Sequence, residues 1–337
     1  MDEFQLLKSA LKPYHLNPST LMIEKKLQSN SWHGDLHFKV CVDNKSYSAR
    51  FIGNKRYETD VFISVSDAVL AEQIRFCNFL FDAGIPFMKH VPTVNGELFT
   101  TIMFGNEEWR FVLFEWIQGN HLTYGTESIA RNFGAFARRL HDVSSRFQSN
   151  VFPQVPHSKG HQTFYTMLCA HAASSTFSPS TTHFLQSYLS EIELHIDRVK
   201  TGSHEFIVQS DLNPLNILWN QKEEITGVVD FESITYTDRV EGLAWLVKWY
   251  SRTQGVASHE MSPVLAKTVW DGYRADELLS PREYERLRSL LWLTGCLNWN
   301  FTSKTIELIK NNEDALLNEH ITKYVRRGKI LSSLLCL

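Results

Sequence analysis

Hydrophobic and polar residues alternate near the beginning of the chain, which is typical of strands with one buried face. Three hydrophobic residues occupy every second position: Phe38, Val40 and Val42. A second alternating stretch covers residues 47–52, and the Asp43-Asn44 pair between the two stretches favours a tight turn. We therefore predict two antiparallel strands, which follow a short helix within residues 1–20 and a polar loop over residues 28–35.

The next segment has the spacing of a helix. Hydrophobic residues recur every three or four positions at Leu70, Ile74, Cys77 and Phe81. Ser66-Asp67 is a suitable N-cap, and Gly84 and Pro86 end the helix. Two more strands are expected over residues 98–104 and 110–117. The centre of the second is apolar throughout, as expected of a strand that is covered on both faces.

Helical spacing dominates the remainder of the chain. One hydrophobic stripe consists of Ile129, Phe133, Phe136, Leu140 and Val143. A loop rich in Pro, His, Gly and Ser is expected over residues 151–162, with further helices over residues 163–200 and from Val240 onward.

Two short apolar strands, at residues 206–208 and 225–231, interrupt this helical pattern. The order of elements predicts an α+β fold with two lobes. A small antiparallel-sheet lobe covers residues 1–117, and a large, mainly helical lobe covers residues 118–337.

Composition excludes several classes of partner. The chain of 337 residues has a net charge of -3 and no run of basic residues, so we expect neither nucleic acid nor an anionic membrane surface as its partner. Acidic residues at positions 2 and 3 and the lack of a long apolar segment argue against a signal peptide or a membrane span. Five cysteines without a C-x-x-C pair indicate reduced thiols and a cytoplasmic protein.

The most informative residues surround the two short strands. Asp211 follows the first strand, Asn216 comes five positions later, and Asp230 ends the second strand. An isolated Asp or Asn beside a proline is usually a turn former. The complete order is more specific: a strand, Asp-Leu-x-Pro-x-Asn-Ile-Leu, a hairpin-length gap, and a strand that ends in Asp-Phe.

This segment resembles the catalytic and metal-binding loops of the aminoglycoside phosphotransferase/choline kinase-like superfamily, and the resemblance extends over residues 24–300. It implies a two-lobed protein-kinase-like fold and transfer of the γ-phosphoryl group of ATP to a hydroxyl of a small molecule. By this resemblance Asp211 is the catalytic base, and Asn216 and Asp230 bind Mg²⁺, a cation that prefers oxygen ligands.

The same resemblance implies a nucleotide site in the sheet lobe. Strand alternation places Ser48 and Arg50 on one face, where kinase-like folds have a small residue over the adenine and then a Lys at the phosphates. Arg50 replaces that Lys, and its expected partner is Glu72 on the first long helix. Backbone groups of Glu115 and Ile117, in the connector between the lobes, are expected to bind adenine. The loop over residues 28–35 would cover the phosphates, although it has no G-x-G-x-x-G.

Three departures have to be weighed, and they keep a second hypothesis open. Gln209 stands where a His is usual, Glu232 replaces the Gly of protein kinases, as is common in this superfamily, and Glu241-Gly242 replaces an Asp that usually anchors the catalytic loop. Gln209, Arg50 and Gly242 motivate a nucleotide-binding, pseudokinase-like module without turnover. A helical interaction protein without nucleotide is a third hypothesis, but it does not explain the Asp-Phe strand end.

Other features have simpler interpretations. His157 and His161 are expected on a surface loop rather than at a metal, and the tryptophans after residue 218 are expected mainly in the core. Trp292 or Trp299 is a weaker candidate for the acceptor site. Amino alcohols, amino acids, sugars and aminoglycosides all stay open as acceptors. The sequence does not determine the oligomeric state or the choice between ATP and GTP.

Overall fold

The computed structural model of the chain describes residues 2–28, 34–53, 66–155, 159–200, 205–256, 258 and 260–335. The chain divides into two compact units. The first consists of Met1–Gly119, Phe147–Phe152 and Thr226–Glu232, and the second of Asn120–Arg146, Pro153–Ile225 and Ser233–Leu337. The short segment Thr226–Glu232 is held in the first unit by backbone pairing, because the Val228 N–H donates to the Pro86 carbonyl at 2.8 Å.

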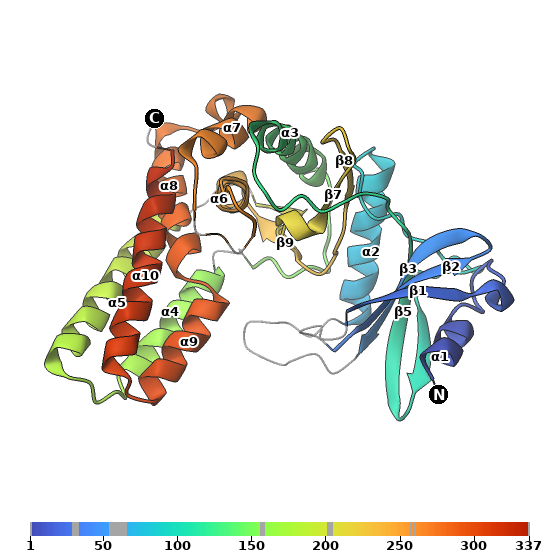
Figure 1. Cartoon of the computed structure of the whole chain (residues 1–337), viewed down its shortest axis with the longest axis horizontal. Coiled ribbons are helices and arrows are strands. Elements are labelled where there is room, and N and C mark those ends of the chain that lie inside the picture. The colour runs from blue at the N-terminus through green and yellow to red at the C-terminus, as the bar shows by residue number, and fades with distance from the viewer. Residues whose placement is uncertain are drawn as a thin grey trace. The chain divides into compact units, whose positions relative to one another are not determined.

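A five-stranded antiparallel sheet forms the centre of the first unit (Figure 1). Its order is β1-β2-β3-β5-β4, with β1 Met22–Gln28, β2 Leu36–Val42, β3 Lys45–Gly53, β4 Thr100–Phe104 and β5 Glu107–Glu115. The predicted hairpin is confirmed. Asp43 and Asn44 have φ values of 50° and 61°, and a two-residue hairpin turn requires this left-handed conformation at both central positions.

Helix α1 (Glu3–Ala10) covers one face of this sheet. Its leucines pack against apolar side chains of β2, β3 and β5 in one buried cluster, which includes Leu6, Leu7, Phe38, Val40, Tyr47, Ala49, Phe51 and Phe111. Each fully buried side chain of this size contributes about 1.5–3 kcal/mol relative to exposure. Ser48 and Arg50 alternate with these core residues along β3, so they belong to the opposite face, as predicted.

Helix α2 (Asp67–Asp82) has the predicted boundaries. The Ser66 hydroxyl accepts the Val69 N–H and caps the first turn, and Gly84 follows the last turn with φ 78°. A positive φ has little steric cost only for glycine, so Gly84 ends the helix where the sequence predicted.

Helices make up most of the second unit, as predicted (Figure 1). They are α3 Glu127–Ser144, α4 Lys159–Ala172, α5 Pro179–Val199, α6 Arg239–Tyr250, α7 Pro263–Tyr273, α8 Pro281–Cys296, α9 Trp299–Lys310 and α10 Asp314–Ser333. Helix α4 begins within the expected loop over residues 151–162, and residues 156–158 of that loop lie outside the described residues.

The short strands differ partly from expectation. Strand β6 (Phe206–Gln209) pairs antiparallel with β9 (Ile234–Thr237), a strand that the sequence did not predict. Strands β7 (Ile217–Trp219) and β8 (Ile225–Val228) are also short. The predicted strand over residues 225–231 stops at Val228, because Asp230 adopts a left-handed φ of 73° that an extended strand cannot contain.

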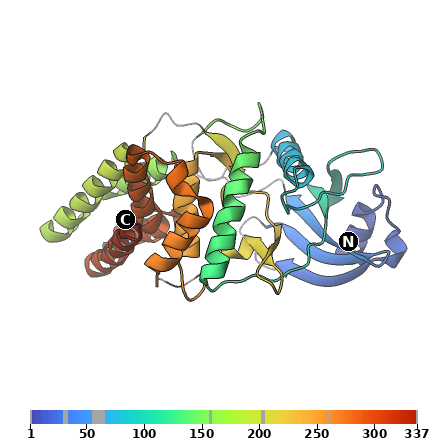
Figure 2. The ribbon, with the colours of Figure 1, turned by 90° about the horizontal axis from the view of Figure 1, so that it is seen from above.

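Two glycines allow α3 and α7 to pack backbone to backbone (Figure 2). A Cβ atom on Gly134 would lie 2.4 Å from the Val269 carbonyl oxygen, and one on Gly272 would lie 2.4 Å from the Arg131 carbonyl oxygen. Both distances are far inside van der Waals contact with rigid backbone atoms. The helices therefore approach more closely than any larger residue at these positions permits.

The cysteines of the described part of the chain are free thiols, and its helices do not have the character of membrane spans. Cys41, Cys77 and Cys296 are buried free thiols, and Cys169 is a half-buried one. Across the described residues, no helix combines the length and the apolar character that crossing a bilayer requires.

We expect Gly134→Ala to destabilise the second unit. Overpacking of this kind costs about 1–3 kcal/mol, although alanine is about 1 kcal/mol better than glycine in an unconstrained helix. The matched control is Gly160→Ala in α4, where an added Cβ meets nothing within 4 Å. Thermal denaturation should show a lower midpoint for Gly134→Ala and an unchanged or higher one for Gly160→Ala. A higher thermal midpoint in both variants would contradict the close contact between α3 and α7.

Candidate active site

The loop after β6 holds Asp211 by local hydrogen bonds. The Asn213 amide nitrogen donates to Asp211 Oδ2 at 3.0 Å. Asn213 also caps the short 3-10 helix Pro214–Asn216, because its side-chain oxygen accepts the Leu215 N–H at 2.8 Å. The carboxylate of Asp211 is half-buried and therefore reachable by a ligand.

Asn216 turns its amide nitrogen toward Asp211. This nitrogen donates to the Asp211 carbonyl oxygen at 2.8 Å and approaches Asp211 Oδ2 at 3.4 Å. Since the nitrogen is occupied in this way, the amide oxygen of Asn216 is directed elsewhere. That oxygen is a suitable ligand for a hard cation.

Gln209 supports the same loop from inside the protein. Its side chain is fully buried, and its Oε1 accepts the Asp211 N–H at 3.1 Å. The substitution of the usual His by Gln209 thus preserves a hydrogen-bonding side chain next to Asp211. The loop therefore keeps a side-chain support at the position of the usual His.

Arg50 occupies the centre of a charged cluster in the first unit. Its Nε and Nη2 donate to Asp35 Oδ2 at 3.2 and 3.1 Å. Its Nη2 also lies 2.7 Å from Glu232 Oε1, and its Nη1 lies 3.9 Å from Asp230 Oδ1. The planar guanidinium can bridge several carboxylates at once, which an ammonium group cannot do equally well.

Arg50 keeps its positive charge although it is buried. Burial alone lowers the pKa of Arg50, but Glu232, Asp35 and Asp230 together raise it above its ordinary value, so the guanidinium stays charged. The guanidinium therefore holds carboxylates from two segments of the first unit close together. Carboxylate oxygens are ligands of the kind that a hard divalent cation prefers.

The expected pair of Arg50 with Glu72 is not formed, which corrects the prediction. The Glu72 carboxylate instead pairs with Arg75, three residues later on α2. Among the described residues the ion pairs of Arg50 are those with Asp35, Asp230 and Glu232. The carboxylates that pair with Arg50 lie just before β2 and just after β8. The residue spacing along α2 could not predict these partners.

Asp230 adopts its left-handed conformation at the start of a turn. Its Oδ1 accepts the Glu232 N–H at 3.1 Å, a local bond that helps Asp to tolerate positive φ. The intervening Phe231 is buried, and its ring lies 5.4 Å from the Phe114 ring and 5.4 Å from the Arg50 guanidinium carbon. This packing fixes the Asp-Phe strand end against the sheet.

Ser48 faces the same side of the sheet as Arg50, as predicted. Its hydroxyl lies 2.7 Å from His37 Nε2, and His37 is paired with Arg50 in the β2–β3 ladder. Burial, followed by the nearby Arg50 charge, lowers the pKa of His37 to about 3. His37 is therefore neutral at physiological pH, and it adds no further charge to the Arg50 cluster.

The connector after β5 leaves a backbone donor available. The N–H groups of Glu115 and Trp116 donate to the Lys89 and Ser46 carbonyls at 2.9 and 3.1 Å. Within the described part of the chain, the Ile117 N–H has no such acceptor. Sheet pairing therefore positions the connector while leaving Ile117 able to donate to a ligand. The loop expected to cover the phosphates cannot be placed, because residues 29–33 lie outside the described residues.

Gly242 stands where the superfamily usually has an anchoring Asp, and a buried ring explains the glycine. A Cβ atom at position 242 would lie 2.7 Å from Cε1 of His141, whose ring is buried and hydrogen-bonded to the Tyr273 hydroxyl at 2.7 Å. The beginning of α6 is held instead by Asp238, which accepts the Glu241 N–H at 3.0 Å.

Asp238 also forms a buried, two-pronged ion pair with Arg286 of α8, at 2.8 and 2.5 Å. This pair was missed in the sequence because its members are 48 positions apart. The pair joins the beginning of α6 to α8 through a buried carboxylate, three residues before Glu241.

Two other expectations are settled by burial. His161 lies in α4 and is buried, so its expected place on a surface loop is wrong, while His157 lies outside the described residues. Trp292 is fully buried and stacks on the His195 ring at 4.2 Å, which places it in the core rather than at a binding site.

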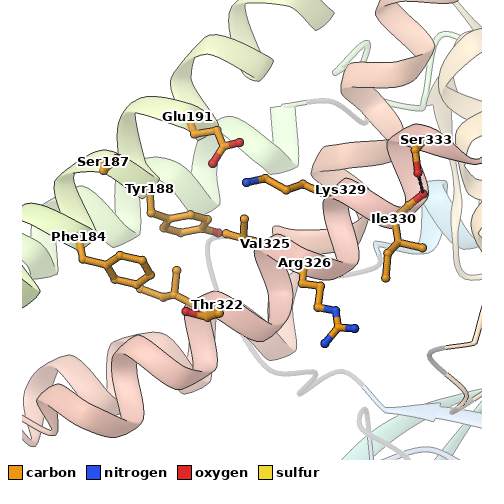
Figure 3. A pocket seen from close by; sticks show the side chains of 11 residues that line it. Phe184, Ser187, Tyr188, Glu191, Thr322, Val325, Arg326, Lys329, Ile330 and Ser333 are labelled. Atoms are coloured by element: carbon orange, nitrogen blue, oxygen red, sulfur yellow. Dashed lines mark hydrogen bonds between the residues drawn. The ribbon is translucent and has the colours of Figure 1, made fainter. Parts of the chain in front are cut away.

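A groove of about 620 Å³ lies between α5 and α10 (Figure 3). Phe184 and Tyr188 of α5 and Val325 of α10 provide its apolar lining, and Glu191 and Lys329 provide charged groups. The site residues predicted from the sequence are not among its lining residues. The groove therefore belongs to a different part of the second unit.

Comparisons with known proteins agree with this architecture. A family model described as the phosphotransferase enzyme family matches residues 63–290. None of the curated proteins matches the sequence. Among solved structures, an amicoumacin kinase in complex with AMP-PNP, Ca²⁺ and Ami has a TM-score of 0.66 and 15% identity, with 98% of this chain and 95% of that chain covered.

Two further structures are similar. A microcompartment-associated aminopropanol kinase has a TM-score of 0.63 and 14% identity, covering 98% of this chain and 96% of its own. Choline kinase from Cryptosporidium parvum Iowa II has a TM-score of 0.57 and 13% identity, with the same coverage of 98% and 96%. At these identities the likeness concerns the fold, and it confirms the predicted two-lobed protein-kinase-like architecture.

We expect Arg50→Met to lower the free energy of unfolding by about 3–5 kcal/mol, because it removes one partner from a buried ion network. Lys45→Met on the same strand is the matched control. Lys45 bridges Glu115 from a half-exposed position, where such a pair contributes less than about 1 kcal/mol. Chemical denaturation of the two variants checks this difference. Equal decreases in the free energy of unfolding would contradict a buried ion network around Arg50.

Proposed function

Because the chain belongs to the phosphotransferase enzyme family, we propose that it transfers the γ-phosphoryl group of ATP to a hydroxyl group of a small molecule in the presence of Mg²⁺. The observation that carries this proposal is the orientation of the catalytic loop. Asn216 and Asn213 both donate to Asp211, which holds one carboxylate and one amide oxygen in fixed positions. A pure scaffold has no need for this arrangement.

Asp211 acts as the base in this proposal. Its carboxylate accepts the proton of the acceptor hydroxyl as the oxygen attacks phosphorus. The hydrogen bond from Asn213 and the support of Gln209 keep the carboxylate in one orientation, so little reorganisation is needed during the reaction.

Asn216 and Asp230 are the proposed metal ligands. The Asn216 amide nitrogen is bonded to Asp211, which leaves its amide oxygen to act as a ligand, and Asp230 supplies a carboxylate oxygen. Bound Mg²⁺ supplies neutralisation of the phosphate charges that shift during transfer. The amicoumacin kinase of similar fold is a complex with AMP-PNP and Ca²⁺, which supports an adenine nucleotide and a divalent cation for this chain as well.

The remaining predicted residues are assigned to the nucleotide. We assign adenine binding to the Glu115 and Ile117 backbone, with Ser48 beneath the base and Arg50 near the phosphates. The Ile117 N–H, which lacks an acceptor in the described part of the chain, supports this role. Glu72 keeps a structural role through Arg75 rather than through Arg50.

An active enzyme is favoured over the pseudokinase-like module. Gln209 still supports Asp211, and the buried Asp238–Arg286 pair supplies an anchor at the beginning of α6. The first contact keeps a hydrogen-bonding side chain at the position of the usual His, and the second fixes the beginning of α6 next to Gly242. The acceptor is a small alcohol, and aminopropanol and choline kinases are among the chains with this fold.

We expect Asp211→Asn to lower the transfer rate by about 10²–10⁴-fold, the usual contribution of a general base. Stabilisation of the protein by Mg²⁺·ATP should be retained, because the amide preserves the shape of the carboxylate. Phosphate transfer across a panel of hydroxyl compounds and thermal denaturation measure the two effects. Asp271→Asn, which changes an exposed carboxylate of α7, is the control. Full activity of Asp211→Asn would exclude Asp211 as the base.

We expect Asn216→Leu to raise the Mg²⁺ concentration needed for half-maximal stabilisation by ATP about tenfold, since one contact to a charged group is lost. Asp230→Asn should act in the same direction. The measurement is a magnesium titration of the thermal midpoint at saturating ATP, with Asn132→Ala at an exposed position as the control. An unchanged titration in both variants would contradict the metal assignment, and no metal-dependent binding of ATP to the unmodified protein would contradict the proposed function.

A further inference from the structure

Helix α6 buries a lysine between two tryptophan rings. Lys248 is 4% exposed, and its Nζ lies 3.9 Å from the Trp245 ring centroid and 5.1 Å from that of Trp249. Of the carboxylates in the described part of the chain, none lies within ion-pair distance of this ammonium group. Cation–π contacts compensate only part of the cost of removing a charge from water.

Two arginines share this environment. Arg252, four positions after Lys248, is 5% exposed, and its guanidinium carbon lies 4.4 Å from the Trp249 ring centroid. Arg327 of α10 has a buried Nε that finds no hydrogen-bond acceptor among the described residues. Neither arginine forms an ion pair with a described carboxylate. Three cations therefore gather where the protein provides few negative charges.

Electrostatics connects these cations with one another and with Asp211. Burial, followed by Arg327 and Arg252, lowers the pKa of Lys248 well below its ordinary value, while the Asp211 carboxylate acts in the opposite direction. Burial and Arg327 lower the pKa of Arg252 to about 10. The cations therefore repel one another, and the proposed catalytic base belongs to the same electrostatic environment.

Cations of the protein itself already lie over the rings of Trp245 and Trp249, which limits the charge that a bound acceptor can carry there. A cationic alcohol is commonly bound over aromatic rings, but Trp245 and Trp249 already carry the protein's own Lys248 and Arg252. A further cation would meet like charges. An anion, in contrast, would relieve the repulsion and supply an acceptor for Arg327 Nε.

Resting on the proposed function, we propose that the acceptor is an alcohol that also carries an anionic group, either a carboxylate or a phosphate. Lys248, Arg252 and Arg327 bind that group, and Asp211 receives the proton of the hydroxyl. In the transfer, the O–H bond of the acceptor breaks, its oxygen bonds to the γ-phosphorus, and the bond from that phosphorus to the bridging oxygen breaks to release ADP. The proton passes from Asp211 to solvent.

The first test compares pairs of alcohols that differ in the anionic group. Homoserine is paired with 3-aminopropan-1-ol, and glycerol 3-phosphate with glycerol, so the two pairs distinguish carboxylate from phosphate. We expect kcat/KM to favour, in one pair, the member that carries the carboxylate or phosphate by at least about tenfold, the effect of one charge-assisted contact. Equal values of kcat/KM, or preference for the member that lacks the carboxylate or phosphate, in every pair that is phosphorylated would overturn the proposal.

The second test needs no knowledge of the acceptor. Binding of sulfate is measured by calorimetry at constant ionic strength, with Mg²⁺ and a nonhydrolysable ATP analogue already bound. We expect Lys248→Met and Arg252→Gln each to weaken sulfate binding at least about tenfold, and Lys248→Arg to restore much of it. Lys267→Met, which removes an exposed lysine of α7, should bind like the unmodified protein. Sulfate binding that is absent, or unaffected at Lys248 and Arg252, would overturn the proposal.

Stability separates an anion site from a purely structural lysine. Removal of a buried and repelled charge should leave the ligand-free thermal midpoint of Lys248→Met equal or higher. A structural lysine would instead make this variant less stable. Metal-dependent stabilisation by ATP is measured in every variant. If the unmodified protein is stabilised by ATP and metal but does not bind sulfate, only the anion site is contradicted. If the unmodified protein shows no metal-dependent stabilisation by ATP, the proposed function is contradicted as well.

Discussion

The buried guanidinium of Arg50 is the interaction on which the first unit most depends. It joins β3 to Asp35 ahead of β2 and to Glu232 after β8, segments that are far apart in the sequence. Without the positive charge, carboxylates would face one another in a region with little water, where repulsion is strong. The positive charge of Arg50 thus allows these carboxylates to lie close together in the first unit.

Local interactions explain why much of the fold was predictable. The Asp43-Asn44 turn, the Ser66 cap and the termination at Gly84 each depend on residues within a few positions of one another. The loop around Asp211 is similar, because Asn213 and Asn216 reach it from two and five positions away. Sequence patterns report such contacts directly.

Contacts between distant segments explain what was not predicted. Arg50 was paired with Glu72 because kinase-like folds place an acid on that helix, yet packing brings Asp35 and Glu232 to the guanidinium. The Asp238–Arg286 pair joins residues 48 positions apart, and β9 is a four-residue strand whose pairing with β6 stabilises it. Neither spacing nor propensity contains this information.

The buried cations Lys248 and Arg252 lie at the end of α6, a helix that begins at Arg239, well after the loop that carries Asp211. The proposed base and the proposed anion-binding groups are therefore carried by different elements. Under this proposal, substitutions at the end of α6 would change which molecules are accepted without changing the loop that carries Asp211. A few substitutions in one element could therefore change the range of substrates.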